Sequence, residues 1–312
     1  MSNIVVLRRQ NGATERCGVI GLYVRKDPSF FEQRNMKEDH PSGTAIGVSV
    51  LRAFHQLFDE FPRILEDPVS PLLLTAEMIE NMRSDRGRFQ TVPARGLRSH
   101  VVLRSRYAED ELRATVKDGL DRFVSLGAGF DTFPFRQPDW AEGLSIVEVD
   151  HPATQKAKQE LFARQRIPFP GNTAFIPLDL EKGDLGESLL TGGNKPVFVS
   201  CLGVLAYLTL GTARRIFGAI GRMPTGSRMA LAFAPQVHEG GDQRAGAAAE
   251  HAAALGEPWQ TYFTEDDLRN ELTRGGFHRV TFLRADDAAD RYYHGRTDLP
   301  APKRTRLCIA EV

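Results

Sequence analysis

The stretch that decides the fold is Ser125-Leu126-Gly127-Ala128-Gly129-Phe130-Asp131-Thr132, which directly follows the apolar pair Phe123-Val124. A short apolar run that leads into two closely spaced glycines is typical of a strand followed by a sharp turn, because glycine tolerates backbone conformations that other residues avoid. In α/β sheets such a turn lies at the carboxyl ends of the strands, where ligands bind. A dinucleotide fingerprint requires a third glycine where this chain has Thr132, so the turn favours a nucleoside ligand over NAD.

Outward from this turn, short apolar runs alternate with amphipathic stretches. This alternation predicts an α/β fold, with a parallel sheet covered by helices on both faces. The last two apolar runs follow one another without an obvious crossover helix, so we expect those strands to be antiparallel. The predicted strands cover 123–126, 144–149, 174–176, 196–201, 229–233, 277–283 and 307–310, and the predicted helices lie near 152–165, 184–190, 209–222 and 265–274.

The flanking segments complete the predicted organisation. Residues 1–41 form an N-terminal extension, interpreted either as a hairpin or arm or as a weakly ordered segment. Apolar residues recur at helical spacing from Ile46 until Pro62 stops the run, which predicts a helical cap over 42–120 with a second helix over 71–82. Residues 121–312 form the core, and a lid insertion near 235–262 contains the alanine-rich helix 245–254.

The overall composition excludes several classes of function. Lys plus Arg and Asp plus Glu both number 40, so no net charge draws the whole molecule to nucleic acid or to an anionic membrane. The three cysteines have no metal-ligand spacing, and no run approaches the ~18 apolar residues of a membrane span. Four apolar residues before Arg8 are too few for a signal peptide. We expect a soluble cytoplasmic protein without a metal, and its oligomeric state, a homodimer included, stays open.

A basic stretch precedes the first predicted strand. It contains six arginines and no acidic residue, and its apolar residues form one face of a long helix. Two interpretations stay open for it: a solvated charged face, or a site that binds an anion. The arginines are Arg86, Arg88, Arg95, Arg98, Arg104 and Arg106.

Acidic residues stand at or just beyond the ends of the first three predicted strands. Asp150 follows the glycine turn by roughly twenty residues, the spacing at which a carboxylate can accept both hydroxyls of a ribose. It could instead cap the helix that begins near Pro152. Asp179 could pair with the exocyclic amine of adenine, and Asp131 lies in the turn itself. Together the three carboxylates predict a nucleoside site.

These motifs resemble the leucine carboxyl methyltransferase superfamily of class I methyltransferases. The resemblance is closer to its bacterial branch of small-molecule O-methyltransferases, which includes polyketide tailoring enzymes. It extends from about residue 42 to 310. The motifs that carry it are 125–132, 147–152 with Lys156 and Lys158, 178–180, Thr44-Ala45, 51–53, 104–110, 202–209, 256–258 and 292–298.

The resemblance implies S-adenosyl-L-methionine as the methyl donor. It also implies a Rossmann-like, seven-stranded, mostly parallel sheet with an antiparallel last strand. The implied contacts are Arg104 with the methionine carboxylate (Arg106 as the fallback), Gly127 and Gly129 with the cofactor backbone, Asp131 with the amino group region, Asp150 with the ribose, and Asp179 and Leu180 with the adenine.

The acceptor side of the site is less defined. Protein-methylating members of the family carry a glutamate where this chain has Leu202, so the resemblance favours a small-molecule acceptor. Methyl transfer needs the acceptor oxygen held at ~3 Å from the methyl group, and only an alcohol or phenol needs a base as well. Candidates for that role are Tyr207, His238, Tyr293 and His294, each of which could equally be structural. Arg296 could bind an acidic acceptor or pair with Asp298.

The leading hypothesis is therefore an S-adenosyl-L-methionine-dependent O-methyltransferase that acts on a carboxylate or hydroxyl of a small molecule. Three alternatives stay open. The first is a carboxyl methyltransferase for a protein or modified-RNA substrate, the second an NAD-dependent oxidoreductase, and the third a catalytically silent nucleoside-binding protein.

Overall fold

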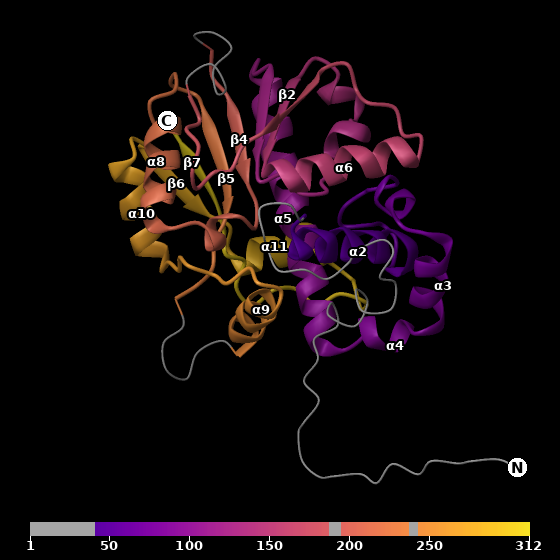
Figure 1. The fold of residues 1–312 in the computed structure, drawn as a ribbon. Coiled ribbons are helices and arrows are strands. Elements are labelled where there is room, and N and C mark those ends of the chain that lie inside the picture. Colours follow the sequence, from indigo (N-terminus) through magenta and orange to yellow (C-terminus); the bar gives the residue numbers. More distant parts are fainter. Residues whose placement is uncertain (1–40, 187–194, 237–242) are drawn as a thin grey trace, which may run out of the picture.

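The computed structural model describes residues 41–186, 195–236 and 243–312, and its centre is one twisted sheet (Figure 1). Seven strands of the described chain form this sheet in the order β3-β2-β1-β4-β5-β7-β6. The first five are parallel, and β7 runs antiparallel to both β5 and β6. The predicted α/β fold is therefore confirmed. The strands are β1 Arg122–Leu126, β2 Ser145–Asp150, β3 Thr173–Pro177, β4 Phe198–Cys201, β5 Arg228–Ala232, β6 Arg279–Phe282 and β7 Leu307–Glu311.

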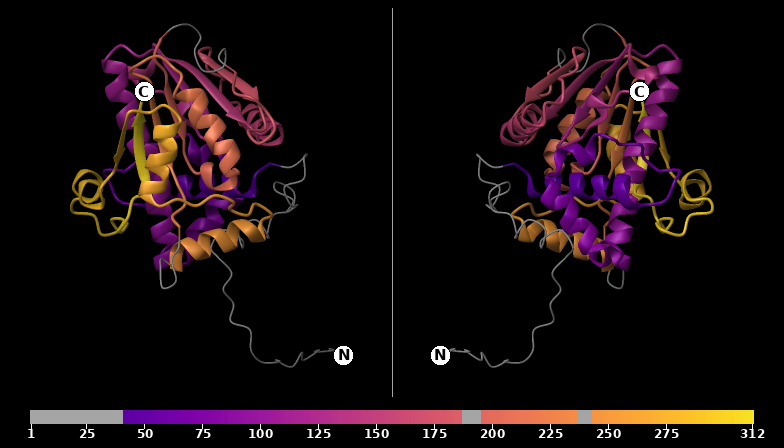
Figure 2. Two further views of the ribbon diagram at one scale, coloured as in Figure 1. Left: turned by 90° about the vertical axis from the view of Figure 1, so that its left-hand side faces the viewer. Right: turned by 90° about the vertical axis from the view of Figure 1, so that its right-hand side faces the viewer.

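Helices cover both faces of the sheet (Figure 2). α8 (Leu210–Ile220) and α10 (Glu265–Arg274) pack on one face, and α5 (Val92–Lys117) and α11 (Ala285–Tyr292) pack on the other. Before α5, the chain forms a helical region. The elements of this helical region are α2 Gly43–Phe58, η1 Ser70–Leu73, α3 Ala76–Ser84 and α4 Arg86–Phe89. The other helices of the described chain are η2 Phe133–Phe135, η3 Asp139–Ala141, α6 Pro152–Arg164, η4 Leu205–Tyr207 and α9 Gln243–Ala254.

Two predictions about helices need correction. The connection between β6 and β7 does contain a helix, α11, which the sequence analysis missed because its apolar face consists mainly of small alanines, of which only Ala288 is buried. The helix predicted over 71–82 is divided into η1 and α3, because Thr75 adopts an extended conformation and caps α3 by accepting a hydrogen bond from the Met78 amide. The stretch predicted as helix over 184–190 lies mostly outside the described residues, and so does the extension over 1–40.

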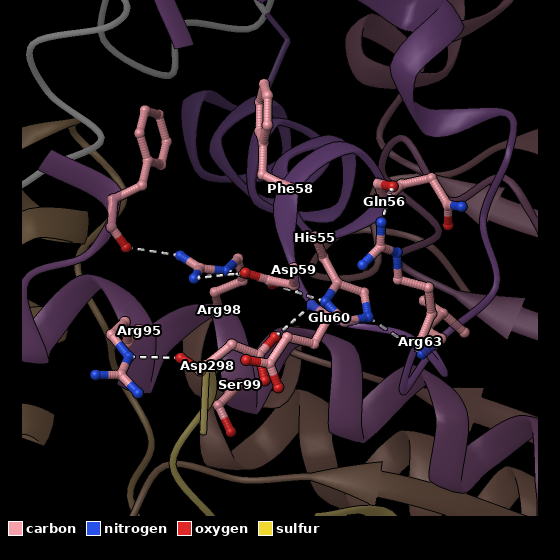
Figure 3. A network of polar contacts seen from close by, with 12 residues as sticks. His55, Gln56, Phe58, Asp59, Glu60, Arg63, Arg95, Arg98, Ser99 and Asp298 are labelled. Carbon is pink, nitrogen blue, oxygen red and sulfur yellow. Dashed lines mark hydrogen bonds and ion pairs between the residues drawn. The ribbon is translucent and has the colours of Figure 1, made fainter. Parts of the chain in front are cut away.

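The basic stretch is not a solvated face at its centre. Arg98 is fully buried, and its Nε and Nη2 donate to the two carboxylate oxygens of Asp59 at 2.7 and 2.9 Å (Figure 3). His55 donates from Nδ1 to the same carboxylate at 2.8 Å, because its Nε2 accepts from the Leu65 amide. Arg98 Nη1 donates to the carbonyl of Phe89 at 2.8 Å. The interpretation as a solvated face is therefore wrong for Arg98, which fixes the start of α5 to the end of α2.

Most of the other arginines in this stretch also have partners within the protein. Arg95 donates to the Asp298 carbonyl at 2.6 Å (Figure 3). It also donates to the Thr297 carbonyl at 2.6 Å. The remaining contacts are Arg86 with the Phe58 carbonyl, Arg88 with Asp85 and Arg106 with Asp110. The charges of the stretch thus hold the helical region together, with Arg104 as an exception described below.

The described residues contain no helix with the length and apolar character that a membrane crossing requires. Within the same ranges, no three or more His, Cys, Asp or Glu side chains are grouped so that they could hold a metal ion.

Removal of the Arg98 side chain should destabilise the fold strongly. Arg98→Ala leaves the buried Asp59 carboxylate without its guanidinium, and breaking such a pair costs about 3–5 kcal/mol of unfolding free energy. Arg88→Ala is the control, because Arg88 and Asp85 form a partly exposed pair that should contribute less than about 1 kcal/mol. Urea unfolding measures both, and equal losses for the two variants would contradict this account.

Candidate active site

The turn after β1 is closely packed on two sides. Gly127 and Gly129 have φ angles of +64° and +53°, in the left-handed region that favours glycine. The Gly127 amide donates to the Val149 carbonyl at 2.8 Å, which ties the turn to the end of β2. A Cβ atom on Gly127 would lie 2.1 Å from Val204 in the loop after β4, and one on Gly129 would lie 3.2 Å from Ala45 in α2. We call residues 127–131 the glycine turn; Val204 leaves no room for a side chain at Gly127, and Ala45 leaves little at Gly129.

Asp150 lies beside this turn, at the end of β2. One carboxylate oxygen accepts from the Gly129 amide and the other accepts from the His151 amide. Burial raises the pKa of Asp150, although these two backbone hydrogen bonds oppose the shift. The alternative role as a helix cap is wrong, because His151 caps α6 by accepting from the Ala153 amide. Each oxygen of Asp150 keeps a lone pair with which it can accept a further hydrogen bond.

The end of β3 lies next to Asp150, since the Leu178 amide donates to the Asp150 carbonyl at 2.8 Å. This places Asp179 and Leu180 on the same edge of the sheet. The Asp179 carboxylate accepts from the Glu181 amide at 2.9 Å, and its side chain is 26% exposed. Leu180 is buried, and its carbonyl accepts from Arg215. The structure therefore brings Asp150, Asp179 and the glycine turn together, as the strand order requires.

Asp131 is part of a buried ion-pair network. Its Oδ1 accepts from Arg52 Nη1 at 3.0 Å and from the Phe133 amide at 2.9 Å. Although burial opposes ionisation, Arg52 and Arg136 lower the pKa of Asp131, so the carboxylate is charged. Within the described ranges, its Oδ2 accepts no hydrogen bond, and this atom is available to a ligand.

The other members of this network were missed by the sequence analysis. Arg52 donates from Nε to Asp67 at 2.8 Å and from Nη2 to Thr132 at 3.1 Å. The Thr132 hydroxyl donates to Asp67 at 2.7 Å and accepts from Arg136, which also forms a bidentate pair with Glu109. Thr132, the residue that departs from the dinucleotide fingerprint, is thus a fully buried junction. No motif could have revealed Asp67 or Arg136, because the partners are far apart in the sequence.

Arg104 differs from the other arginines of α5. It forms no hydrogen bond or ion pair with any residue in the described ranges. Burial lowers its pKa to about 10, with Tyr207 opposing this shift, so its guanidinium is still protonated at neutral pH. A Cβ on Gly203, just after β4, would lie 2.2 Å from Arg104 Nη1. Among the described residues, this cation therefore has no counter-ion, and it lies at the edge of the sheet where β1 and β4 end.

The candidate acceptor residues lie in different surroundings. Tyr207 interacts electrostatically with Arg104, and its ring makes an edge contact with Trp259. The hydroxyl of Tyr293 is 2.7 Å from that of Ser99, in the core between α5 and α11. His294 is exposed, and His238 lies outside the described residues. Arg296 pairs with Asp298 at 2.7 Å and donates to the carbonyls of Glu60 and Pro62, so its guanidinium is already engaged.

Several known proteins are similar to this chain in sequence or in fold. YktD of Bacillus subtilis, assigned by name to the S-adenosyl-L-methionine-dependent methyltransferases, is 29% identical over 289 residues, which are 84% of this chain and 95% of YktD. FRAAL3718 of Frankia alni, assigned by name to the same class, is 28% identical over 265 residues, which are 80% of this chain and 87% of the relative. A crystal structure of a DUF574 family protein from Streptomyces avermitilis has a TM-score of 0.50 and 15% identity, with 84% of this chain and 96% of that chain covered.

The structural likeness shows the fold, and the sequence shows the family. The leucine carboxyl methyltransferase family matches residues 45–221, which are more than half of the 312-residue chain. The matched segment includes α2, the glycine turn, Arg104, Asp150 and Asp179. The resemblance drawn from the motifs is thereby confirmed: this chain belongs to the leucine carboxyl methyltransferase family of class I S-adenosyl-L-methionine-dependent methyltransferases.

Proposed function

We propose that this chain transfers the methyl group of S-adenosyl-L-methionine to a carboxylate or hydroxyl oxygen of a small molecule. Family membership and the names of its relatives support the methyl donor. The single observation that carries the proposal is Arg104, a half-buried guanidinium without an anionic partner in the described part of the chain. Leaving a buried charge unpaired is costly, and a ligand carboxylate at this position would remove that cost.

The donor set around the glycine turn fits S-adenosyl-L-methionine. Arg104 would hold the carboxylate of the methionine part, and Asp131 Oδ2 would face its ammonium group. Asp150 would accept from the ribose hydroxyls, and Asp179 would accept from the adenine amine beside Leu180. The left-handed Gly127 and Gly129 let the ligand approach the backbone. When bound, the cofactor supplies a methyl group on a positively charged sulfur, which is susceptible to attack by an oxygen.

The chain contributes to the reaction mainly by positioning the acceptor oxygen next to the methyl group. Holding the acceptor oxygen at about 3–3.5 Å from the reacting carbon converts a bimolecular step into an intramolecular one. A carboxylate acceptor needs no base, whereas an alcohol or phenol needs a group that takes or shares its proton. Among the four candidates, Tyr207 is the one that interacts electrostatically with Arg104, which supports assigning it to orient the acceptor.

Leu202 supports a small molecule over a protein carboxyl terminus as the acceptor. It follows β4 directly and is partly buried against the cluster between the sheet and α5. A leucine at this position offers neither charge nor hydrogen bond to a peptide. We extend the proposal to a cytoplasmic enzyme whose partner is the small-molecule acceptor.

Calorimetry with S-adenosylhomocysteine, S-adenosyl-L-methionine and NAD tests the proposal first. We expect the two sulfur ligands to bind and NAD to show no heat. Turnover is then measured with a panel of carboxylic acids, phenols and alcohols. Absence of binding by the sulfur ligands would contradict the proposal, and binding without turnover on the whole panel would favour a silent nucleoside-binding protein.

Replacement of Arg104 should affect stability and binding in opposite directions. Arg104→Met keeps the bulk of the side chain and removes the unpaired charge, so the ligand-free protein should gain about 1–3 kcal/mol of unfolding free energy, the cost of burying a polar group without a hydrogen-bond partner. Binding of S-adenosylhomocysteine should weaken at least tenfold, or about 1.4 kcal/mol. Arg106→Met is the control, and a larger loss of affinity there would move the carboxylate site to Arg106.

Replacement of Asp150 tests the ribose contact. Asp150→Ala should weaken S-adenosylhomocysteine binding by about 1.5–3 kcal/mol, the scale of a lost hydrogen bond to a charged group. Asp139→Ala, a change at an exposed aspartate in the loop after β1, should leave the affinity unchanged. Calorimetry measures both variants. An unchanged affinity in a destabilised Asp150→Ala protein would restrict Asp150 to a structural role.

A further inference from the structure

Glu257 is a buried carboxylate outside the residues assigned so far. It is 3% exposed and lies three residues beyond Ala254, the last residue of α9. Gly256 has a φ angle of +79°, its amide donates to the Ala253 carbonyl at 3.0 Å, and the Glu257 amide donates to the Ala252 carbonyl at 2.9 Å. These two bonds form a Schellman motif, and they fix the position from which the Glu257 side chain extends.

The Glu257 carboxylate binds the amino-terminal end of α2. Its Oε1 accepts from the Gly43 amide at 2.7 Å. Its Oε2 accepts from the Ser42 hydroxyl at 3.0 Å, from the Thr44 amide at 3.4 Å and from the Thr44 hydroxyl. Helix amides at this end have no partner in the helix and carry partial positive charge. Glu257 therefore supplies both the hydrogen-bond acceptors and the negative charge that this end of α2 lacks.

The end of α2 that Glu257 binds lies against the glycine turn. Ala45, one residue after Thr44, is the neighbour that a Cβ on Gly129 would meet at 3.2 Å. The Ser42 amide also donates to Thr154 at 3.1 Å, in the first turn of α6 just beyond Asp150. Any movement of this helix end would therefore change the contacts at Gly129 and at the start of α6.

The segment after Glu257 is bound to the other side of the glycine turn. The Gln260 and Thr261 amides donate to the Ala206 carbonyl at 2.7 and 3.2 Å, and the Thr261 hydroxyl donates to the Leu208 carbonyl at 2.6 Å. Ala206 belongs to the loop after β4, in which Val204 contacts Gly127. We call residues 257–261 the strap, because it joins α2 on one side of the glycine turn to this loop on the other.

We propose that Glu257 is a positioning residue that keeps α2 closed against the glycine turn and so sets how long the cofactor stays bound. The inference rests on the proposed function, because it concerns retention of the same cofactor. Glu257 touches neither the cofactor residues nor the reacting atoms and acts through α2. Figures 1 and 2 show α9, which is followed by the strap, next to the helical region that begins with α2.

The charge of Glu257 is what the geometry requires. Its two oxygens accept from four donors, and an ionised carboxylate has about four lone-pair sites for them. A glutamine has only one acceptor oxygen, and its amide group would direct hydrogens at the donors of Ser42, Gly43 or Thr44. Glu257→Gln therefore preserves size and shape while it opposes the closed position of α2.

The main test measures the dissociation rate of S-adenosylhomocysteine by stopped flow. In Glu257→Gln we expect dissociation to be about tenfold faster, the effect of about one hydrogen bond to a charged group. Glu250→Gln is the matched control, because Glu250 is an exposed glutamate on α9. In this variant S-adenosylhomocysteine should dissociate at the wild-type rate. Unchanged dissociation in Glu257→Gln would overturn the inference.

A second variant separates positioning from a general loss of stability. Thr44→Val removes one of the four donors, and we expect a roughly threefold faster dissociation, a fraction of the full effect. In the double variant the two effects should fall short of their product, because both changes disrupt the same contact. If the two changes multiply their effects on the dissociation rate, the inference is overturned. If Glu257→Gln does not fold, Thr44→Val alone decides, and an unchanged dissociation rate in that variant would overturn the inference.

Hydrogen exchange locates the effect in the chain. Bound S-adenosylhomocysteine should slow the exchange of amides 43–46 in the wild type, and Glu257→Gln should lose this protection while α8 exchanges as before. Equal acceleration in α8 would show a merely structural role and overturn the inference. A wild-type chain that does not bind S-adenosylhomocysteine would overturn the proposed function itself, whereas wild-type binding with an unchanged Glu257→Gln overturns only the role of Glu257.

Discussion

The ion pairs of Arg52 are the interaction on which the rest of the site depends. This side chain comes from α2 and reaches Asp67, Asp131 and Thr132, so one guanidinium joins the helical region to the glycine turn. Such a buried network stabilises a unique arrangement only when its members are all paired. Arg136 and Glu109 complete the pairing. The helical region is therefore joined directly to the glycine turn, and we include it in the proposed cofactor site.

The chain has equal numbers of acidic and basic residues, and many of them pair with one another inside the fold. Arg98 neutralises Asp59 within the helical region, and Arg296 neutralises Asp298 in the segment that follows α11. Arg104 is different, because the described chain gives it electrostatic neighbours but no ion pair. Arg104 shares this lack of an ion pair with the buried Arg63 in the described residues, but Arg104 alone of the two lies next to Gly203 at the end of β4. This position, rather than any overall charge, supports the proposed binding site.

The sequence predicts the sheet, and it predicts that the glycine turn, Asp150 and Asp179 meet at one edge of that sheet, because both depend on local patterns. Apolar runs mark the strands, and the glycine turn with Asp150 and Asp179 follows from their succession. The sequence cannot predict the partners of Arg98 or Arg52, since Asp59, Asp67 and Thr132 are brought to them only by tertiary packing. The sequence analysis did not predict helix α11, because that helix buries only one small side chain. It did not predict the role of Glu257, because that role depends on contacts with residues more than 200 positions away.

The measurement that tests the central claim most directly is a crystal structure of the protein with S-adenosylhomocysteine bound. The account predicts that the ligand carboxylate lies within hydrogen-bond distance of the Arg104 guanidinium, with the ribose hydroxyls on Asp150 and the adenine beside Asp179 and Leu180. A ligand whose carboxylate is bound elsewhere, with Arg104 still lacking an anionic partner, would contradict it.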